Sequence, residues 1–167
     1  MSRQSIKLAA LLITTALLTS ACGIGFNAGT SQQKASGNGR SADIGSIQVR
    51  GALIVIDPKK PGWGTFVGTI INTAPEKDKF LGVELYPADG TSSRTNEPLN
   101  NQVAVQFPVP GTRSLPLQLT TDVKAGTLIN VLLDFKTNSA IPMKLLVENN
   151  DGIYSDIIVH STEGIIN

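Results

Sequence analysis

Between Ile44 and Val159 the chain is divided into short segments in which apolar and polar residues alternate, separated by turns rich in glycine, proline and asparagine. Alternation with a period of two is typical of β-strands, because successive side chains point to opposite faces. No segment after residue 21 has a convincing helical period. About eight strands are expected, and two antiparallel sheets must cover each other's apolar faces. The sequence therefore predicts an all-β, immunoglobulin-like antiparallel β-sandwich.

The alternation also predicts which side chains share a face. The first strand is expected to place Ile47, Val49, Leu53 and Val55 on one side and to become apolar on both sides toward its end. Later strands are expected to bury alternate residues: Phe66 and Ile70; Leu81, Val83 and Leu85; Val103, Val105 and Phe107; Leu115, Leu117 and Leu119; Ile129, Val131, Leu133 and Phe135; Ile141, Met143, Leu145 and Val147; and Ile153, Ile157 and Val159. Pro116 lacks a backbone donor, which predicts an edge strand.

The N-terminus has the features of an export signal. A basic start with Arg3 and Lys7 is followed by an apolar run, Leu8–Leu18, which is too short to span a bilayer as a helix. Small residues then precede Cys22, the only cysteine of the chain. This order resembles the bacterial lipobox, although Thr19 replaces its usual leucine. Residues 1–21 are expected to be a lipoprotein signal peptide, with the Cys22 thiol as the lipid attachment point.

The mature chain is expected to begin with a tether. Residues 22–41 are rich in Gly, Ser, Asn, Gln and Thr, a composition that cannot bury enough surface to order itself, and residues 42–167 form the β-sandwich domain. Arg3 and Lys7 leave with the signal, so the 14 basic residues become 12 against 13 acidic ones. No basic stripe indicates nucleic acid. The protein is thus expected at the extracytoplasmic side of the cell membrane, anchored to lipid through Cys22.

The residues do not indicate an enzyme. Acidic residues are scattered over turns, including the charged turn APEKDK that contains Glu76 and Asp78, and a solvated loop is the expected explanation of that turn. A hydrolase would depend on His160, the only histidine, without a Gly-x-Ser-x-Gly turn. No catalytic residue and no cofactor are therefore expected.

One loop suggests protein or headgroup contact. The stretch DPKKPGWGTF carries Lys59, Lys60 and Trp63, the only tryptophan, and its two prolines stiffen the backbone. Cations and an aromatic ring on a rigid support are typical of docking sites. The alternative is that Trp63 folds over the open end of the sandwich as a plug of the core.

Three stretches together resemble a known family: NGRSADIGSIQVRGALIV, GTFVGTIINTAPEKDKFLGVEL and LTTDVKAGTLINVLLDFKTNSAIPMKLLVE. In order and spacing they are similar to the actinobacterial lipoproteins called LpqE, which belong with periplasmic copper chaperones of the PCuAC type. The resemblance covers roughly residues 38–150 and implies a cupredoxin-like β-sandwich. It also implies a place on the outer face of the plasma membrane and an accessory role beside a membrane complex of the respiratory type.

The copper ligands of that family are not matched. The chaperones use histidines and methionines, but His160 and Met143 are the only such residues left once Met1 is removed. The family's His-x-Met falls near Arg113 and Leu115, which cannot bind Cu(I). Met143 is expected in the core and His160 at the surface, so no metal site is expected. The first hypothesis is a non-enzymatic, membrane-anchored binding module; the alternatives are a divergent copper chaperone using His160 and Met143, and a structural envelope lipoprotein.

Overall fold

A computed structural model describes residues 38–86, 92–108, 114–120 and 122–160. Nine strands and one short 3₁₀-helix make up this part of the chain: β1 Arg40–Ile44, β2 Ile47–Ile56, β3 Trp63–Asn72, β4 Asp78–Leu85, β5 Ser92–Leu99, β6 Ala104–Phe107, β7 Pro116–Gln118, β8 Leu128–Phe135, β9 Ile141–Asn149 and η1 Gly152–Tyr154. The expected signal peptide, Cys22 and residues 22–37 of the expected tether lie outside the described residues. No helix in the described part is long and apolar enough to cross a membrane.

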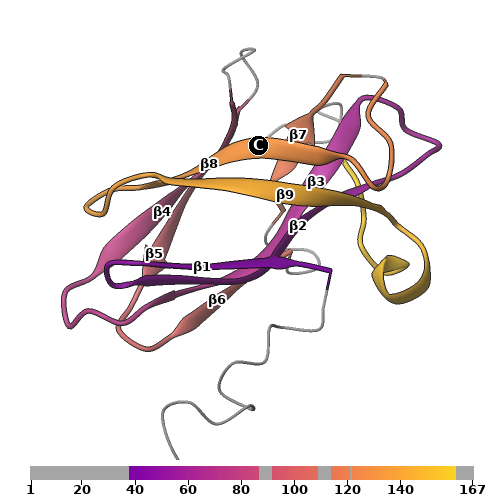
Figure 1. Cartoon of the computed structure of the whole chain (residues 1–167). Helices are drawn as coiled ribbons and strands as arrows, with labels where there is room; N and C mark the ends of the chain where they lie inside the picture. Colours follow the sequence, from indigo (N-terminus) through magenta and orange to yellow (C-terminus); the bar gives the residue numbers. More distant parts are fainter. Residues whose placement is uncertain (1–37, 87–91, 109–113, 121, 161–167) are drawn as a thin grey trace, which may run out of the picture. The chain divides into compact units, whose positions relative to one another are not determined.

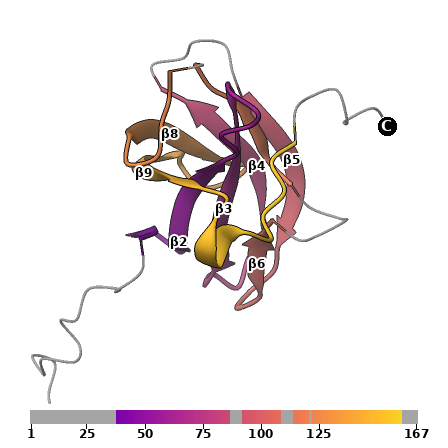
Figure 2. The same ribbon diagram turned by 90° about the vertical axis from the view of Figure 1, so that its right-hand side faces the viewer.

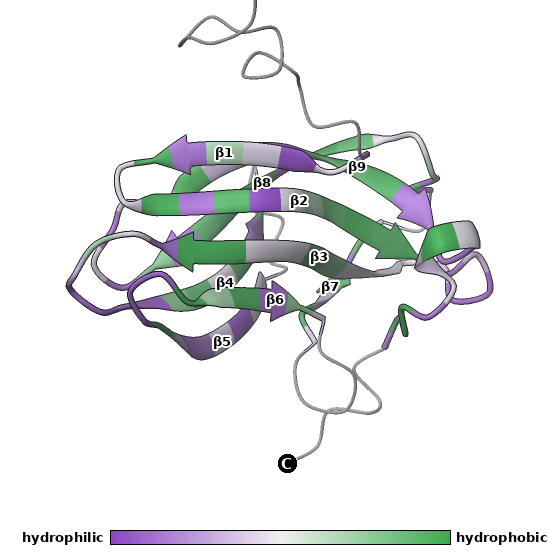
Figure 3. Cartoon of the chain, turned by 90° about the horizontal axis from the view of Figure 1, so that it is seen from below, coloured by the Kyte–Doolittle hydropathy of each residue, from purple (hydrophilic) through white to green (hydrophobic). Residues whose placement is uncertain are grey.

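The strands form two layers that share β9. Hydrogen bonds order them as β5-β4-β8-β9-β2-β3-β6, with β1 added to β2 and β7 added to β3 (Figure 1). All pairs of named strands are antiparallel except β2 with β9, which run parallel from Ile54↔Val147 to Ile56↔Asn149. Figure 3 shows β1, β2, β3 and β6 side by side. The predicted all-β sandwich is confirmed.

The core lies between the layers and contains an aromatic cluster. Phe80 contacts Phe107 and Phe135 with ring centroids 5.4 Å apart, and Phe66 packs against Phe80 at 6.3 Å. Alternation predicted this core correctly for β3, β7, β8 and β9: Met143 is buried in it, as expected, and so are Leu115, Leu117 and Leu119. The predicted edge position is also confirmed, because β7 with Pro116 pairs with β3 alone.

Two glycines reverse the predicted faces of β2 and β4. The register of β2 shifts between Arg50 and Leu53, around Gly51 at φ 61°. Ala52, Ile54 and Ile56 therefore join Ile47 and Val49 in the core, whereas Leu53 and Val55 face the opposite side. The prediction that all four of Ile47, Val49, Leu53 and Val55 share a face was wrong because a β-bulge inserts one residue and inverts the alternation.

The same irregularity changes β4. Its register shifts between Phe80 and Gly82, and Gly82 has φ 141°. Phe80, Val83 and Leu85 face the core, while Leu81 is only half-buried outside it. The expected trio of Leu81, Val83 and Leu85 was therefore correct for only two members.

Other expectations failed at single segments. Residues 152–160 do not form a strand: η1 and an irregular segment follow β9. Val103 precedes β6 and is exposed. β5 and β1 were not expected, and β1 begins at Arg40, two residues before the boundary drawn for the domain. Asp78, expected in a solvated loop, is buried and accepts hydrogen bonds from Lys79, Thr137 and Asn138.

Candidate binding pocket at one end of the sandwich

The loop between β2 and β3 is held by its own backbone. The Lys60 N–H donates to the Asp57 carbonyl at 2.8 Å, and the Trp63 N–H donates to the Lys60 carbonyl at 3.3 Å. The Lys59 N–H donates to Asp57 Oδ1 at 2.9 Å. Pro58 and Pro61 fix two φ angles between these bonds. The loop is therefore a stiff support, as the sequence predicted.

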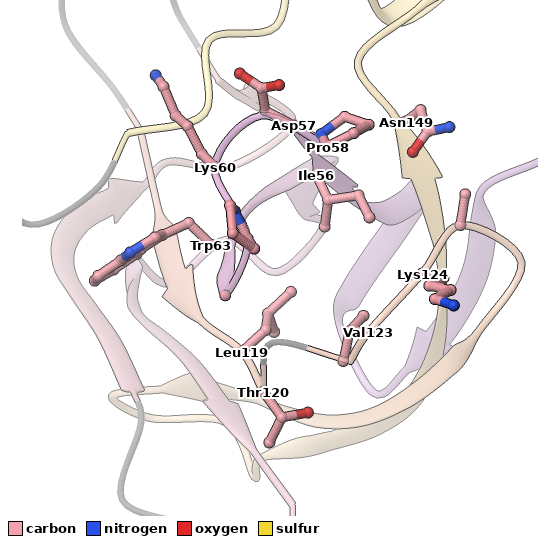
Figure 4. A pocket seen from close by; sticks show the side chains of 13 residues that line it. Ile56, Asp57, Pro58, Lys60, Trp63, Leu119, Thr120, Val123, Lys124 and Asn149 are labelled. Atoms are coloured by element: carbon pink, nitrogen blue, oxygen red, sulfur yellow. The ribbon is translucent and has the colours of Figure 1, made fainter.

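A pocket of about 400 Å³ opens between this loop and the β7–β8 connection. Ile56 and Leu119 are buried and form its floor together with half-buried Val123. Figure 4 shows these three side chains at the centre of the pocket, with Lys60 and Lys124 on opposite sides of the rim. The Leu119 N–H donates to the Gly62 carbonyl at 2.8 Å, which fixes the two walls to each other.

The rim carries both signs of charge. Asp57, Lys60 and Lys124 line the pocket, beside the amide of Asn149. A hydrogen bond from the Thr120 side chain, then one from its own backbone N–H and the charge of the Lys124 ammonium, lower the pKa of the exposed Asp122 carboxyl from its ordinary value. An apolar floor inside a polar rim is suited to an amphipathic group, such as an apolar side chain flanked by a charged one.

The structure brings together two of the three predicted contact residues. Lys60 and Trp63 line the pocket, whereas Lys59 is exposed outside it. The Lys60 ammonium donates to the Val159 carbonyl at 2.7 Å.

Trp63 packs differently from the predicted plug of the core. It is half-buried, and it packs outside the main core, against the cluster of Leu53, Val55 and Val159. It is thus not a plug of the main core, and its contact with a partner stays a prediction.

The opposite wall was missed by the sequence analysis. Leu119, Val123 and Lys124 come from a connection far from the first loop in the chain. The end of the Leu115–Leu119 alternation did mark where β7 stops. The end of β7 lies beside Gly62 because β7 pairs with β3. That pairing had no local signal in the sequence.

The residues considered for copper lie apart. Met143 belongs to the main core, whereas His160 is exposed and follows Val159, which packs on the other face of β2. Leu115 is buried in the core, and Arg113 lies outside the described residues. In the described ranges, no group of three His, Cys, Asp or Glu residues is placed to hold a metal ion.

The comparisons place this geometry among solved structures. No family model and no curated protein matches the chain. The apo PCuAC domain from PmoF1 aligns with TM-score 0.57 and 13% identity over 66% of this chain and 99% of that domain. The copper-bound PCuAC domain from PmoF2 aligns with TM-score 0.55 and 14% identity over 66% and 98%. The apo PmoF2 domain gives 0.55 and 15% over 68% and 98%. The chain therefore shares the fold of PCuAC domains.

Proposed function

We propose that this protein is a lipid-anchored, extracytoplasmic binding module without enzymatic activity, which holds a membrane protein complex at the pocket beside the β2–β3 loop. The pocket is the observation that carries the proposal. It combines an apolar floor of Ile56, Leu119 and Val123 with a charged rim. The two loops that carry the rim are joined by a backbone hydrogen bond. A rigid support reduces the entropy lost on binding, which favours recognition of a partner.

The anchor in this proposal is Cys22. Its support is the order of basic start, short apolar run and small residues before the cysteine. Metabolic labelling with a palmitate analogue should tag the wild-type chain and leave Cys22→Ala untagged. Label that persists in Cys22→Ala would remove the anchor from the proposal.

The partner is tested by altering the pocket. The full-length chain is purified from its native membrane in mild detergent, as wild type and as the double variant Val123→Ser, Lys124→Glu. Wild type should retain a defined set of membrane proteins, and the pocket variant should lose most of them. Lys144→Glu, an exposed change on β9 outside this pocket, serves as the charge-matched control. Equal recovery by all three proteins would contradict docking at the pocket.

A second candidate function is copper transfer, favoured by the likeness to a copper-bound PCuAC domain. The positions of Met143 and His160 on opposite sides of β2 argue against a shared Cu(I) site. Anaerobic Cu(I) titration of the Cys22→Ala chain separates the two candidates. Stoichiometric binding that is abolished by His160→Ala would favour the copper function over the docking function.

A further inference from the structure

The segment after β9, residues 150–160, crosses the outer face of β2 and β3 as a strap (Figure 2). It starts where the Asn150 N–H donates to the Ile56 carbonyl at 2.9 Å and turns through η1. Beyond Ser155 it has no regular secondary structure. The strap therefore lacks the ladder of hydrogen bonds that holds the strands of this domain together.

Packing of the strap creates the second hydrophobic cluster. Val159 is 1% exposed and lies against Leu53 and Val55, the two β2 side chains that the bulge turns outward. The cluster also includes four half-buried side chains: Trp63, Val67, Tyr154 and Ile157. Burial and, to a smaller extent, the Glu148 carboxylate raise the pKa of Tyr154.

Two side-chain hydrogen bonds tie the end of the strap to the sheet. Thr65 Oγ1 donates to the Ile158 carbonyl at 3.4 Å, which is a long bond. Lys60 Nζ donates to the Val159 carbonyl at 2.7 Å and joins residues that are 99 positions apart. The short, charge-assisted bond from Lys60 is the stronger of the two.

Lys60 also stands on the rim of the pocket. We propose that Lys60 is a latch that couples the pocket to the strap: a carboxylate of the partner, bound at the rim, takes the ammonium from the Val159 carbonyl and loosens the end of the strap. This inference rests on the pocket named in the proposed function and assigns an acidic, partly apolar segment as its occupant.

The chemistry favours such an exchange. An ammonium group binds an ionised carboxylate more strongly than a neutral carbonyl, and a Lys60 side chain that turns toward a carboxylate inside the pocket moves its ammonium away from the Val159 carbonyl. If the partner binds the loosened state more tightly than the latched state, binding of the partner shifts the strap toward the loosened state by the same factor. The reason is that the coupling of two sites is reciprocal. The Asp57 carboxylate lines the same rim and repels other carboxylates. An acidic group that does not reach Lys60 is therefore disfavoured.

The state of the latch is readable at two built-in positions. The Ile157 N–H donates to the Tyr154 carbonyl at 3.0 Å within the strap, so its hydrogen exchange reports loosening. Trp63 packs in the same cluster and is the only tryptophan, so its fluorescence gives a second signal while the pocket, which it also lines, holds no ligand. The Val147 N–H, bonded to the Thr127 carbonyl at 2.9 Å, serves as the internal reference outside the strap.

The first experiment removes the latch in the unliganded full-length chain. Lys60→Met should speed exchange at Ile157 by about tenfold to a hundredfold, as expected for loss of a charge-assisted hydrogen bond, and leave Val147 unchanged. The matched control is Lys59→Met, which removes a neighbouring charge whose ammonium has no hydrogen bond or ion pair to the described residues. Unchanged exchange in Lys60→Met would overturn the latch.

The second experiment supplies a carboxylate. Millimolar hexanoate added to wild type should move Ile157 exchange toward the value of Lys60→Met, whereas hexanamide of equal shape should not. The Lys60→Met chain should respond to neither compound. Absence of a hexanoate response in wild type, or an equal response to the amide, would overturn the coupling. A partner that is retained through the pocket while Ile157 stays protected would overturn this inference alone and leave the proposed function standing.

Discussion

Asn138 donates its side-chain amide to Asp78 Oδ2 at 2.7 Å and so joins the start of β4 to the β8–β9 connection. The same carboxylate accepts backbone N–H groups from Lys79 at 2.7 Å, Thr137 at 2.8 Å and Asn138 at 3.1 Å. A buried charge is tolerated when donors of this kind surround it. Asp78 is therefore a structural fastener between two turns.

Replacing Asp78 should destabilise the domain more than a surface change does. In Asp78→Ala three backbone donors and the Asn138 amide lose their acceptor, and we expect the free energy of unfolding to fall by about 2–4 kcal/mol. Urea denaturation followed by circular dichroism measures it. The control is Glu76→Ala on the exposed part of the same turn, expected to change stability by less than about 0.5 kcal/mol. Equal effects of the two variants would contradict the fastener.

The same carboxylate should impose a pH dependence. Burial raises the pKa of Asp78, but the hydrogen bonds from Asn138, Lys79 and Thr137 outweigh it, and the pKa is lowered from 3.8. A lowered folded-state pKa gives stability that is present above pH 3.8 and is lost as the pH falls through the folded-state pKa. The difference in unfolding free energy between wild type and Asp78→Asn should be constant above about pH 5 and should narrow below pH 3.8. If this difference in unfolding free energy widened on acidification, the pKa of Asp78 would be raised and not lowered by folding.

The bulge glycines differ in what a side chain would cost. A Cβ at Gly51 would meet nothing within 4 Å, so Gly51→Ala should cost only the strain of a positive φ, about 1 kcal/mol. Gly51→Asn should cost less, because Asn tolerates that region. A Cβ at Gly82 would lie 2.1 Å from the Ser93 carbonyl oxygen, and Gly82→Ala should be the most damaging of the three. The melting temperatures of the three variants give their order of stability. A lower melting temperature for Gly51→Ala than for Gly82→Ala would contradict the backbone conformation at these two glycines.

Trp63→Ala should reduce stability by about 1–3 kcal/mol, below the ~3–5 kcal/mol expected for a fully buried aromatic side chain. The reason is that Trp63 is half-buried against Leu53, Val55 and Val159. In wild type, tryptophan emission should lie between the water-exposed and core limits, with partial quenching by iodide. Water-like emission together with an unchanged melt of Trp63→Ala would place the indole in solvent, contrary to this packing.

Alternation predicted the core wherever a strand is regular. In β8, Val131, Leu133 and Phe135 face inward as the period of two requires. The same rule failed after Gly51 and Gly82. A glycine can lie at a bulge or within a regular strand, and the periodicity of the sequence does not distinguish these two cases. β2 and β4, the two strands whose core-facing side chains were predicted wrongly in part, each contain such a glycine. In both strands the register shifts at that glycine.

Polar strands and the strap lay beyond the reach of the sequence for another reason. Apart from Ser93 and Leu99, β5 is half-buried or exposed, so it has little apolar alternation, and it is a strand because β4 offers it backbone partners. Ile157 and Val159 do alternate, but they cover a sheet face instead of extending the sheet. The candidate pocket was half predicted: the β2–β3 loop has a local signature, whereas its opposite wall is brought there by long-range pairing.

The parallel pairing of β2 with β9 fixes when the domain can close. Within the described residues β2 is the second strand and β9 is the last, yet they are neighbours at the centre of the strand order. A chain that emerges with its N-terminus first cannot complete this pair until β9 has followed, and such distant contacts are slow to form. Until then Ile54 and Ile56 lack the neighbouring strand beside them. The contact that joins the two layers through β9 therefore forms only after nearly the whole domain has emerged.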